Sequence, residues 1–171
     1  MPTMSGIRLT TPMGDVQVTA HGDGPGPAVL TVRADGMPAL RRLPPGMRID
    51  GGALILIEGA FAAGGTVAVS MMLHPSRPLP DAEPNPGEHL DCVVISDGGR
   101  HLALAARDTE WMAARQPDAP GYAVRTMPAG LAVEAGPFTA GARIRLPLAL
   151  AWASGPDPLT VWFGVDAILP N

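Results

Sequence analysis

The stretch PFTAGARIRLPLALAWASGPDPLTVWFGVDAIL, residues 137–169, decides the fold class. On both sides of the Gly-Pro-Asp-Pro turn at 155–158, apolar side chains recur at every second position. Because successive side chains of a β-strand point to opposite faces, this period of two predicts two strands, 142–152 and 158–169. One face of the first holds Ile144, Leu146, Leu148, Leu150 and Trp152, and one face of the second holds Leu159, Val161, Phe163, Val165, Ala167 and Leu169.

Ten further segments alternate in the same way, with Gly and Pro between them. They are residues 6–10, 15–21, 27–34, 38–42, 53–58, 65–73, 89–96, 99–107, 121–127 and 129–135. Asp50-Gly51-Gly52 and Asp97-Gly98-Gly99 are typical of hairpin turns, because glycine adopts the positive φ that tight turns require. So many short strands predict an all-β protein with a single domain, 1–171, folded as an antiparallel β-sandwich of the jelly-roll type.

The composition is that of a globular protein, since 46% of the residues are hydrophobic and 16% are charged. A nucleic-acid-binding protein normally has a basic face, so the net charge of −4 predicts no nucleic-acid partner. No apolar stretch has the length and continuity of a signal peptide or a membrane span. We therefore expect no membrane partner and synthesis in the cytoplasm, with assembly into a virion or similar particle as one outcome.

Two segments interrupt the strand pattern. Residues 74–88, HPSRPLPDAEPNPGE, hold five prolines and three acidic residues, which predicts a loop that is either an interaction arm or a surface crossover. Residues 107–121 form an irregular or short helical segment. Asp108 is a suitable helix N-cap and Pro117 ends the helix in that interpretation, whereas in the other the preceding strand runs on into a loop.

Common catalytic motifs are missing: there is no phosphate-binding glycine loop, no Gly-x-Ser-x-Gly sequence and no His-x-His pair. His89 and Asp91 share a strand face, as the first two ligands of a cupin-type metal site do. The predicted hairpin, however, places His101 about 20 Å from His89, too far to share a metal. Asp108 and Glu110 form a carboxylate pair that helix capping or solvent exposure accounts for. We expect no catalytic residue, no metal and no cofactor.

The remaining reactive side chain is Cys92, which lies in the segment HLDCVVIS on the same strand face as Leu90 and Val94. A reactive cysteine needs an accessible, electropositive setting. We interpret Cys92 as a buried structural thiol.

Apolar residues in two places indicate a second layer or a second subunit. Residues 53–57, ALILI, are apolar on both strand faces, so that strand lies between two layers or under another subunit. Trp162 and Ile168 fall on the outward face of the last predicted strand, where large apolar side chains need a cover. We expect them at an interface between subunits. Trp111, in the irregular segment, either stacks on a sugar or a partner protein or closes one end of the sandwich.

Residues near the C-terminus follow a pattern known from other last strands: Phe138, Gly141, Ile144 and Leu146, and then Val161, Trp162, Phe163, Gly164, Val165 and Leu169. In this they resemble the tumour-necrosis-factor-like jelly rolls, a family that includes the globular head of the complement first component. Ala142 stands where that family usually has Asp. The resemblance implies a compact trimer about a threefold axis, with the outer loops used for binding.

The sequence thus favours a non-enzymatic structural or adhesive β-domain that forms a homo-oligomer, first of all a trimer. A component of a phage or phage-like particle, such as a head decoration, capsid or fibre protein, fits this expectation, with other particle proteins as partners. The alternative is a carbohydrate-binding β-sandwich that holds a surface glycan near Trp111, Asp81, Glu83 and Glu88. A jelly-roll hydrolase is a third interpretation.

Overall fold

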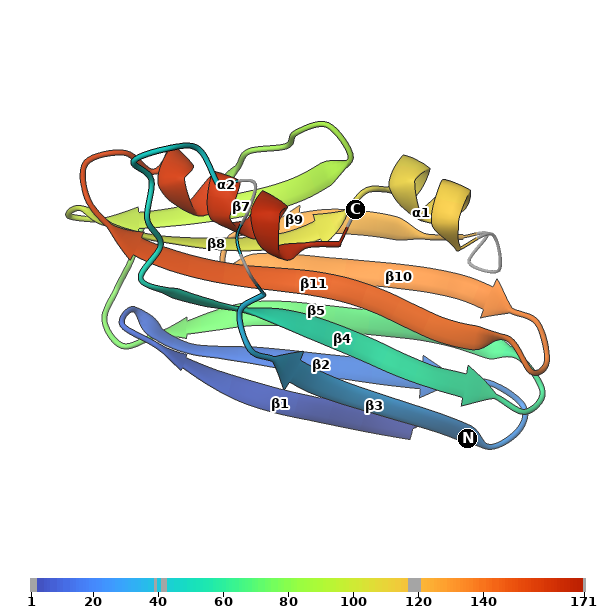
Figure 1. The fold of residues 1–171 in the computed structure, drawn as a ribbon. Helices are drawn as coiled ribbons and strands as arrows, with labels where there is room; N and C mark the ends of the chain where they lie inside the picture. The colour runs from blue at the N-terminus through green and yellow to red at the C-terminus, as the bar shows by residue number, and fades with distance from the viewer. Residues whose placement is uncertain (1–2, 39, 41–42, 117–120, 171) are drawn as a thin grey trace.

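The computed structural model describes residues 3–38, 40, 43–116 and 121–170 (Figure 1). Within these residues the chain forms eleven strands and two helices. In chain order they are β1 Thr3–Thr11, β2 Gly14–Asp23, β3 Ala28–Asp35, β4 Gly51–Phe61, β5 Gly65–Pro75, β6 Glu83–Pro84, β7 Leu90–Asp97, β8 Arg100–Arg107, α1 Thr109–Arg115, β9 Ala123–Met127, β10 Gly130–Phe138, β11 Arg143–Ser154 and α2 Leu159–Ile168. Neither helix has the length and apolar character that crossing a membrane requires.

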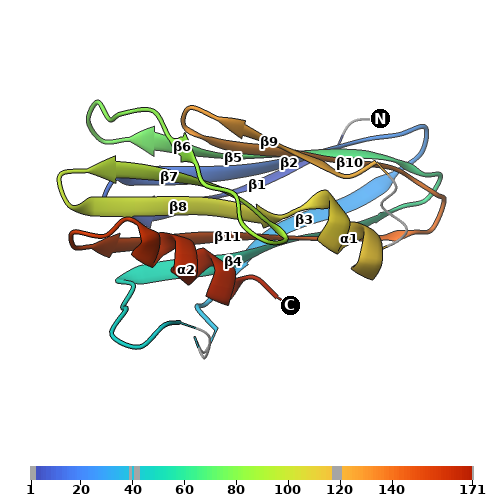
Figure 2. The same ribbon diagram turned by 90° about the horizontal axis from the view of Figure 1, so that it is seen from above.

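The strands form two antiparallel sheets that pack as a sandwich (Figure 2). The five-stranded sheet has the order β1-β2-β5-β10-β9, and the six-stranded sheet has the order β3-β4-β11-β8-β7-β6. The hairpins β1–β2, β3–β4, β7–β8 and β9–β10 each stay within one sheet. The predicted antiparallel β-sandwich is confirmed, whereas this strand order does not establish jelly-roll connectivity.

The main core lies between the two sheets and is built from the alternate residues that the period of two identifies. Val18, Val69 and Met71 of the five-stranded sheet belong to the same buried cluster as Ile55 and Leu148 of the six-stranded sheet. Aliphatic side chains predominate in it, and each buried one stabilises the fold by about 1.5–3 kcal/mol relative to exposure. Apolar contacts between the two sheets therefore stabilise the sandwich.

The predicted last strand, 158–169, is wrong, because these residues form the helix α2. The buried side chains of Val161, Val165 and Ile168 recur at helical spacing and share one face. The Asp157 carboxylate accepts a hydrogen bond of 2.9 Å from the Leu159 backbone N–H and so helps to start the first turn. Nearly every residue of this segment is apolar, so a period of two and a helical period both fit it.

Two further expectations change with this result. The resemblance to the last strand of a jelly roll rests on Val161, Trp162, Phe163, Gly164, Val165 and Leu169. The first five of these residues lie in helix α2 and Leu169 caps its end, so none of them forms a strand. The predicted strand 38–42 is not formed at Pro38 or Leu40, and its other residues lie outside the described part of the chain.

Helix α2 covers the outer face of the six-stranded sheet, where short side chains allow a close approach (Figure 2). The alanines that β8 and β11 present on this face are Ala103, Ala105, Ala149, Ala151 and Ala153. At the closest point a Cβ atom on Gly164 would lie 2.8 Å from Ile49 Cγ2 and 3.2 Å from Ala151 Cβ. Only glycine fits there without displacing the sheet or the segment before β4.

This second layer explains the strand that is apolar on both faces. In β4, Ile55 and Ile57 belong to the inner core, whereas Leu54 packs against the cluster beneath α2, together with Leu40 and Ile49. The layer that covers the outer side of β4 therefore comes from the same chain.

Arg107, at the end of β8, fastens the end of α2 to the sheet. Its side chain is 3% exposed and lies 3.1 Å from the Asp166 carboxylate. The guanidinium also donates to the backbone carbonyl oxygens of Asp166, Leu169 and Pro170 at 3.1–3.4 Å. A cation is favourable here because the last carbonyl groups of a helix carry partial negative charge.

Arg107→Met keeps an unbranched apolar side chain but removes every hydrogen bond that the guanidinium makes. We expect the free energy of unfolding to fall by about 3 kcal/mol, because buried carbonyl groups and Asp166 lose their donor. Urea unfolding followed by circular dichroism measures the change. Arg33→Met is the matched control, since Arg33 pairs with Asp35 and Glu58 at the surface and should cost little. Equal losses in the two variants would contradict the role assigned to Arg107.

Candidate functional site

The outer face of the five-stranded sheet is open, in contrast to that of the six-stranded sheet. In the described part of the chain α2 lies on the six-stranded sheet, and α1 contributes Trp111 and Met112 to the inner core. The open face carries rows of side chains across the strands, in which polar residues are mixed with glycine, alanine and methionine. One row is Gly6, Thr19, Ser70, Ala132 and Arg125, and the next is Arg8, Gln17, Met72, Gly130 and Met127. We call this surface the open sheet face.

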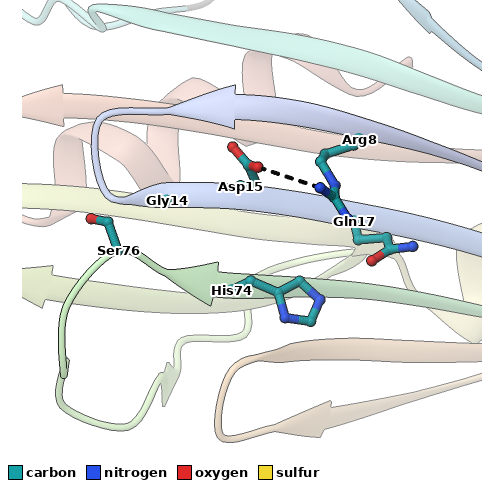
Figure 3. A pocket seen from close by; sticks show the side chains of 6 residues that line it. All are labelled: Arg8, Gly14, Asp15, Gln17, His74 and Ser76. Carbon is teal, nitrogen blue, oxygen red and sulfur yellow. Dashed lines mark ion pairs between the residues drawn. The ribbon is translucent and has the colours of Figure 1, made fainter.

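Two adjoining hollows lie at one end of the open sheet face. The first, of about 280 Å³, is lined by Arg8, Asp15, Gln17 and His74 (Figure 3). The second, of about 410 Å³, shares Gln17 and His74 and adds Thr19 and Ser70. Because the two hollows share residues, they form one shallow depression along β2 and β5.

The electrostatics of this depression are mild. Arg8 and Asp15 form an ion pair of 3.9 Å, and their side chains are 64% and 39% exposed. Water screens a pair this exposed, so both groups remain available to a ligand. Amide, hydroxyl, imidazole, guanidinium and carboxylate groups together offer donors and acceptors at short range.

A third hollow, of about 370 Å³, lies at the other end of the open sheet face. Its polar side chains are His21, Asp23, Thr66 and Glu134. The sequence of the predicted strands 15–21 and 65–73 could have identified the open sheet face as a candidate binding surface. Every outward position of these two strands is polar or small, except Met72. Sequence reasoning missed the open sheet face because it considered only the acidic loops and the tryptophans as binding residues.

Asp81 and Glu83, two of the predicted carbohydrate-binding residues, do lie together. They line a groove of about 480 Å³ between the proline-rich loop and β7, with Ser96 and Pro158 also in its wall. His101 stands beside it: its Nδ1 lies 2.8 Å from the Ser96 hydroxyl and its Nε2 lies 2.8 Å from the Gly155 carbonyl oxygen. A carbonyl only accepts, so Nε2 carries the proton and Nδ1 accepts the serine hydroxyl.

This Ser96–His101 pair has two members of a nucleophilic triad, with a neutral carbonyl in place of the orienting carboxylate. A carbonyl stabilises an imidazolium less well than a carboxylate does. The two residues also face each other across the β7–β8 hairpin, and His101 is 5% exposed. The arrangement therefore ties the turn before α2 to the hairpin.

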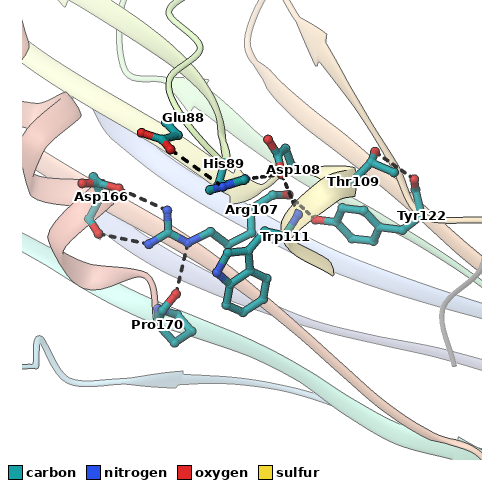
Figure 4. Close-up of polar contacts among 9 residues, drawn as sticks. All are labelled: Glu88, His89, Arg107, Asp108, Thr109, Trp111, Tyr122, Asp166 and Pro170. Atoms are coloured by element: carbon teal, nitrogen blue, oxygen red, sulfur yellow. Dashed lines mark hydrogen bonds and ion pairs between the residues drawn. The ribbon is translucent and has the colours of Figure 1, made fainter. Parts of the chain in front are cut away.

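Trp111 and Glu88, both drawn in Figure 4, are not among the residues that line that groove. Trp111 is 8% exposed and belongs to the inner core, and the guanidinium of Arg115 stands 4.7 Å from its ring centroid. It closes the sandwich and leaves no free ring face for a sugar. Glu88 is 93% exposed and lies beside His89, before the first residue of β7, whereas Glu83 pairs with Val94 in the middle of that strand. The four predicted binding residues thus do not form one site.

Trp162 and Ile168 lie on α2 rather than on an outward strand face, so the reason for placing them at a subunit interface is wrong. Ile168 is 2% exposed and packs in the cluster beneath the helix. Trp162 is half-buried, and its indole N–H donates a hydrogen bond of 2.8 Å to the Asn85 carbonyl oxygen. A Cβ atom on Gly87 would lie 2.3 Å from its ring, so the proline-rich loop folds closely over it. Both residues serve contacts within the chain.

Burial dominates the titration of the groups near β7. It raises the pKa of Cys92 to about 12, and the charge of Asp91 adds to the effect. It also raises the pKa of Asp91, with a further contribution from Asp108, and that of Tyr122. Because a thiolate is the reactive form, burial disfavours reaction at Cys92 in the folded protein.

A thiol reagent tests this directly. At pH 8 we expect Cys92 to react with a disulfide reagent at least about 100-fold more slowly in the native protein than in urea, because a pKa near 12 leaves almost no thiolate. The released chromophore measures the rate. Rapid, complete modification of the native protein would contradict the burial of this side chain.

No protein-family model matches the chain, and no curated protein or solved structure matches it either. The site is therefore assigned from the chain's own geometry. The open sheet face offers three hollows with polar side chains in their walls, and the proline-rich loop offers one acidic groove. The predicted tryptophans pack within the fold.

Proposed function

We propose that this protein is a non-enzymatic adhesive module that binds a hydroxyl-rich polymer, of the carbohydrate class, on the open sheet face. The observation that carries the proposal is the contrast between the two sheets. The middle of one outer face is apolar and covered by α2, whereas the other face has no such cover in the described chain and is hollowed along β2 and β5, where Arg8, Asp15, Gln17, Thr19, Ser70 and His74 line the hollows. A surface of this kind suits a ligand that itself presents many donors and acceptors.

The chemistry of the face points to hydrogen bonding rather than to stacking. The aromatic residues lie elsewhere: Phe61, Trp111, Tyr122, Phe138 and Trp152 belong to or pack against the inner core, and Trp162 and Phe163 lie on α2. Each neutral hydrogen bond contributes about 0.5–1.5 kcal/mol net, so a single short ligand binds weakly here. An extended polymer that reaches both ends of the face gains from multiple contacts.

The Ser96–His101 pair does not change this proposal into a hydrolytic one. The second nitrogen of His101 faces the Gly155 carbonyl oxygen, where a triad would have a carboxylate. The carboxylates of the neighbouring groove, Asp81 and Glu83, belong to the proline-rich loop and not to the hairpin that holds the pair.

A glycan array followed by calorimetry tests the proposed function. Ser70→Arg places a long cation at the centre of the open sheet face, and we expect it to weaken binding of the selected glycan at least about tenfold, or about 1.4 kcal/mol. Thr31→Arg is the matched control, because Thr31 is exposed on β3 of the other sheet and should leave affinity unchanged. The proposal fails if the unmodified protein binds no glycan, or if both variants bind as it does.

A specific observation also favours assembly of several copies, in keeping with the expectation of a homo-oligomer. Strand β1 is an edge strand of nine residues, and its only pairing among the described strands is with β2. It contains no proline and one charged residue, Arg8, and its Met4 is 72% exposed. Natural proteins usually protect such edges with charges, prolines or bulges, so an edge like β1 is suited to pairing with a second chain. Trimeric symmetry and a place in a phage particle stay predictions.

Light scattering measures the mass of the assembly. We expect a multiple of the 17.6 kDa chain mass for the unmodified protein and the single-chain mass for a Met4→Lys, Thr10→Lys variant, because lysines on an edge strand oppose strand pairing. Thr66→Lys, on the central strand β5, should keep the assembly intact. A single-chain mass for the unmodified protein would contradict assembly through β1.

A further inference from the structure

A cluster of metal-ligating side chains lies where β7 begins and β8 runs into α1, and two of its members, His89 and Asp108, are drawn in Figure 4. One ligand atom from each of His89, Asp108 and Glu110 can be chosen so that the three lie within 4.8 Å of one another. His89 comes from the turn before β7, Asp108 is the N-cap of α1, and Glu110 lies in its first turn. Residues from two separate segments of the chain thus meet at one point.

The backbone holds His89 in place. The turn is closed by hydrogen bonds in both directions between Gly87 and Leu90, of 2.9 and 3.3 Å. The Asp108 N–H donates to the His89 carbonyl oxygen at 3.2 Å, which ties the turn to the start of α1. His89 has a φ of +57°, the only positive φ of a non-glycine residue in the described chain. Such backbone strain is concentrated at functional sites, and here it accompanies an unusual side-chain environment.

The imidazole nitrogen that faces the cluster lacks a hydrogen-bond partner. His89 Nδ1 is buried and unpaired, and it lies 3.6 Å from Asp108 Oδ1, beyond hydrogen-bond range. That oxygen already accepts a hydrogen bond of 2.9 Å from the Trp111 N–H. An imidazole nitrogen and two carboxylates therefore converge, and the nitrogen has no hydrogen-bond partner, although buried polar atoms are nearly always paired.

We propose that His89, Asp108 and Glu110 bind a divalent transition-metal ion of the zinc type, with water as the fourth ligand. Three protein ligands of nitrogen and oxygen type plus one open position are a common zinc arrangement. With bonds of about 2.1 Å, tetrahedral ligands lie about 3.4 Å apart, close to the present His89–Asp108 separation. The three ligand atoms lie within 4.8 Å of one another, so the carboxylate of Glu110 must move closer to complete the site. Its side chain is exposed and can rotate to do so.

The charges around the cluster favour a cation. Asp91 lies close enough to Asp108 to interact with it electrostatically. Glu88 Oε1 is 4.0 Å from His89 Nε2, but its side chain is 93% exposed, so water screens its charge. The nearest arginines are engaged elsewhere: Arg107 pairs with Asp166, and Arg115 stands over the Trp111 ring. An imidazole ligand favours zinc-like ions over magnesium and calcium, which prefer oxygen ligands alone.

Zinc chloride added to the full chain tests the proposal, with thermal unfolding and calorimetry as readouts. Asp108→Asn keeps a residue that caps helices, and His89→Asn keeps one that tolerates positive φ, so both remove a ligand with the least damage to the backbone. Glu110→Gln changes an exposed position. His74→Asn on the open sheet face and Glu88→Gln beside the cluster are matched controls that remove a surface histidine and a neighbouring acid.

We expect zinc to raise the unfolding temperature of the unmodified protein and to bind with one-site stoichiometry, whereas calcium does neither. Each of the three ligand variants should bind zinc at least about tenfold more weakly, and the two controls should bind as the unmodified protein does. The proposal is overturned if millimolar zinc gives no saturable binding, or if Glu110→Gln and His89→Asn both retain full affinity. Loss of binding in His74→Asn alone would place the zinc on the open sheet face and would likewise overturn it.

Discussion

The middle strands of the six-stranded sheet are apolar on both faces, and the rest of the structure depends on covering them twice. The five-stranded sheet covers the inner face with large aliphatic side chains, and α2 covers the outer face across a surface of alanines. A helix can approach that surface closely because the sheet side chains are short and Gly164 removes its own Cβ at the contact. Arg107 then holds the C-terminal end of the helix in place. Without this second cover, β4, β8 and β11 would expose a broad apolar surface.

The strands were predictable where polar and apolar residues alternate, because a half-buried strand has a period of two. The helix α2 was not, because the segment 158–169 has almost no polar face to reveal its period. In the structure, the Asp157 side chain binds the first turn of this helix, and Val161, Val165 and Ile168 are buried on one helix face. In the sequence, the same residues also fit a strand, because apolar residues occupy nearly every position of the segment. The error had a consequence for function: once the segment is a helix, the outward apolar face that argued for a subunit interface becomes the inner face of an intrachain layer.

The positions of the candidate sites depend on contacts that no local pattern contains. Asp81 and Glu83 are close in sequence and line the same groove, so their proximity could be read from the proline-rich loop itself. His89 and Asp108 meet because the β7–β8 hairpin brings the first residues of β7 beside the last residues of β8, and Leu90 pairs with Arg107. The metal site considered in the sequence joined His89 to His101, but His101 pairs with Ser96 at the turn of the hairpin, which is the end opposite His89. Only the register of the hairpin shows that His89 lies beside Asp108. Rejecting a site shared with His101 therefore did not test a site shared with Asp108.

The two proposed sites differ in how they are built, and this difference bears on what each can do. The open sheet face consists of exposed side chains on regular strands, so its residues are easily replaced, and its binding depends on many weak contacts. The cluster at His89 is held by a strained turn, a helix N-cap and a backbone hydrogen bond between them. A metal ion there would join the turn before β7 to the start of α1, and α1 in turn carries Trp111 into the core. The cluster is thus placed to stabilise one end of the sandwich, while the uncovered sheet remains free for a ligand.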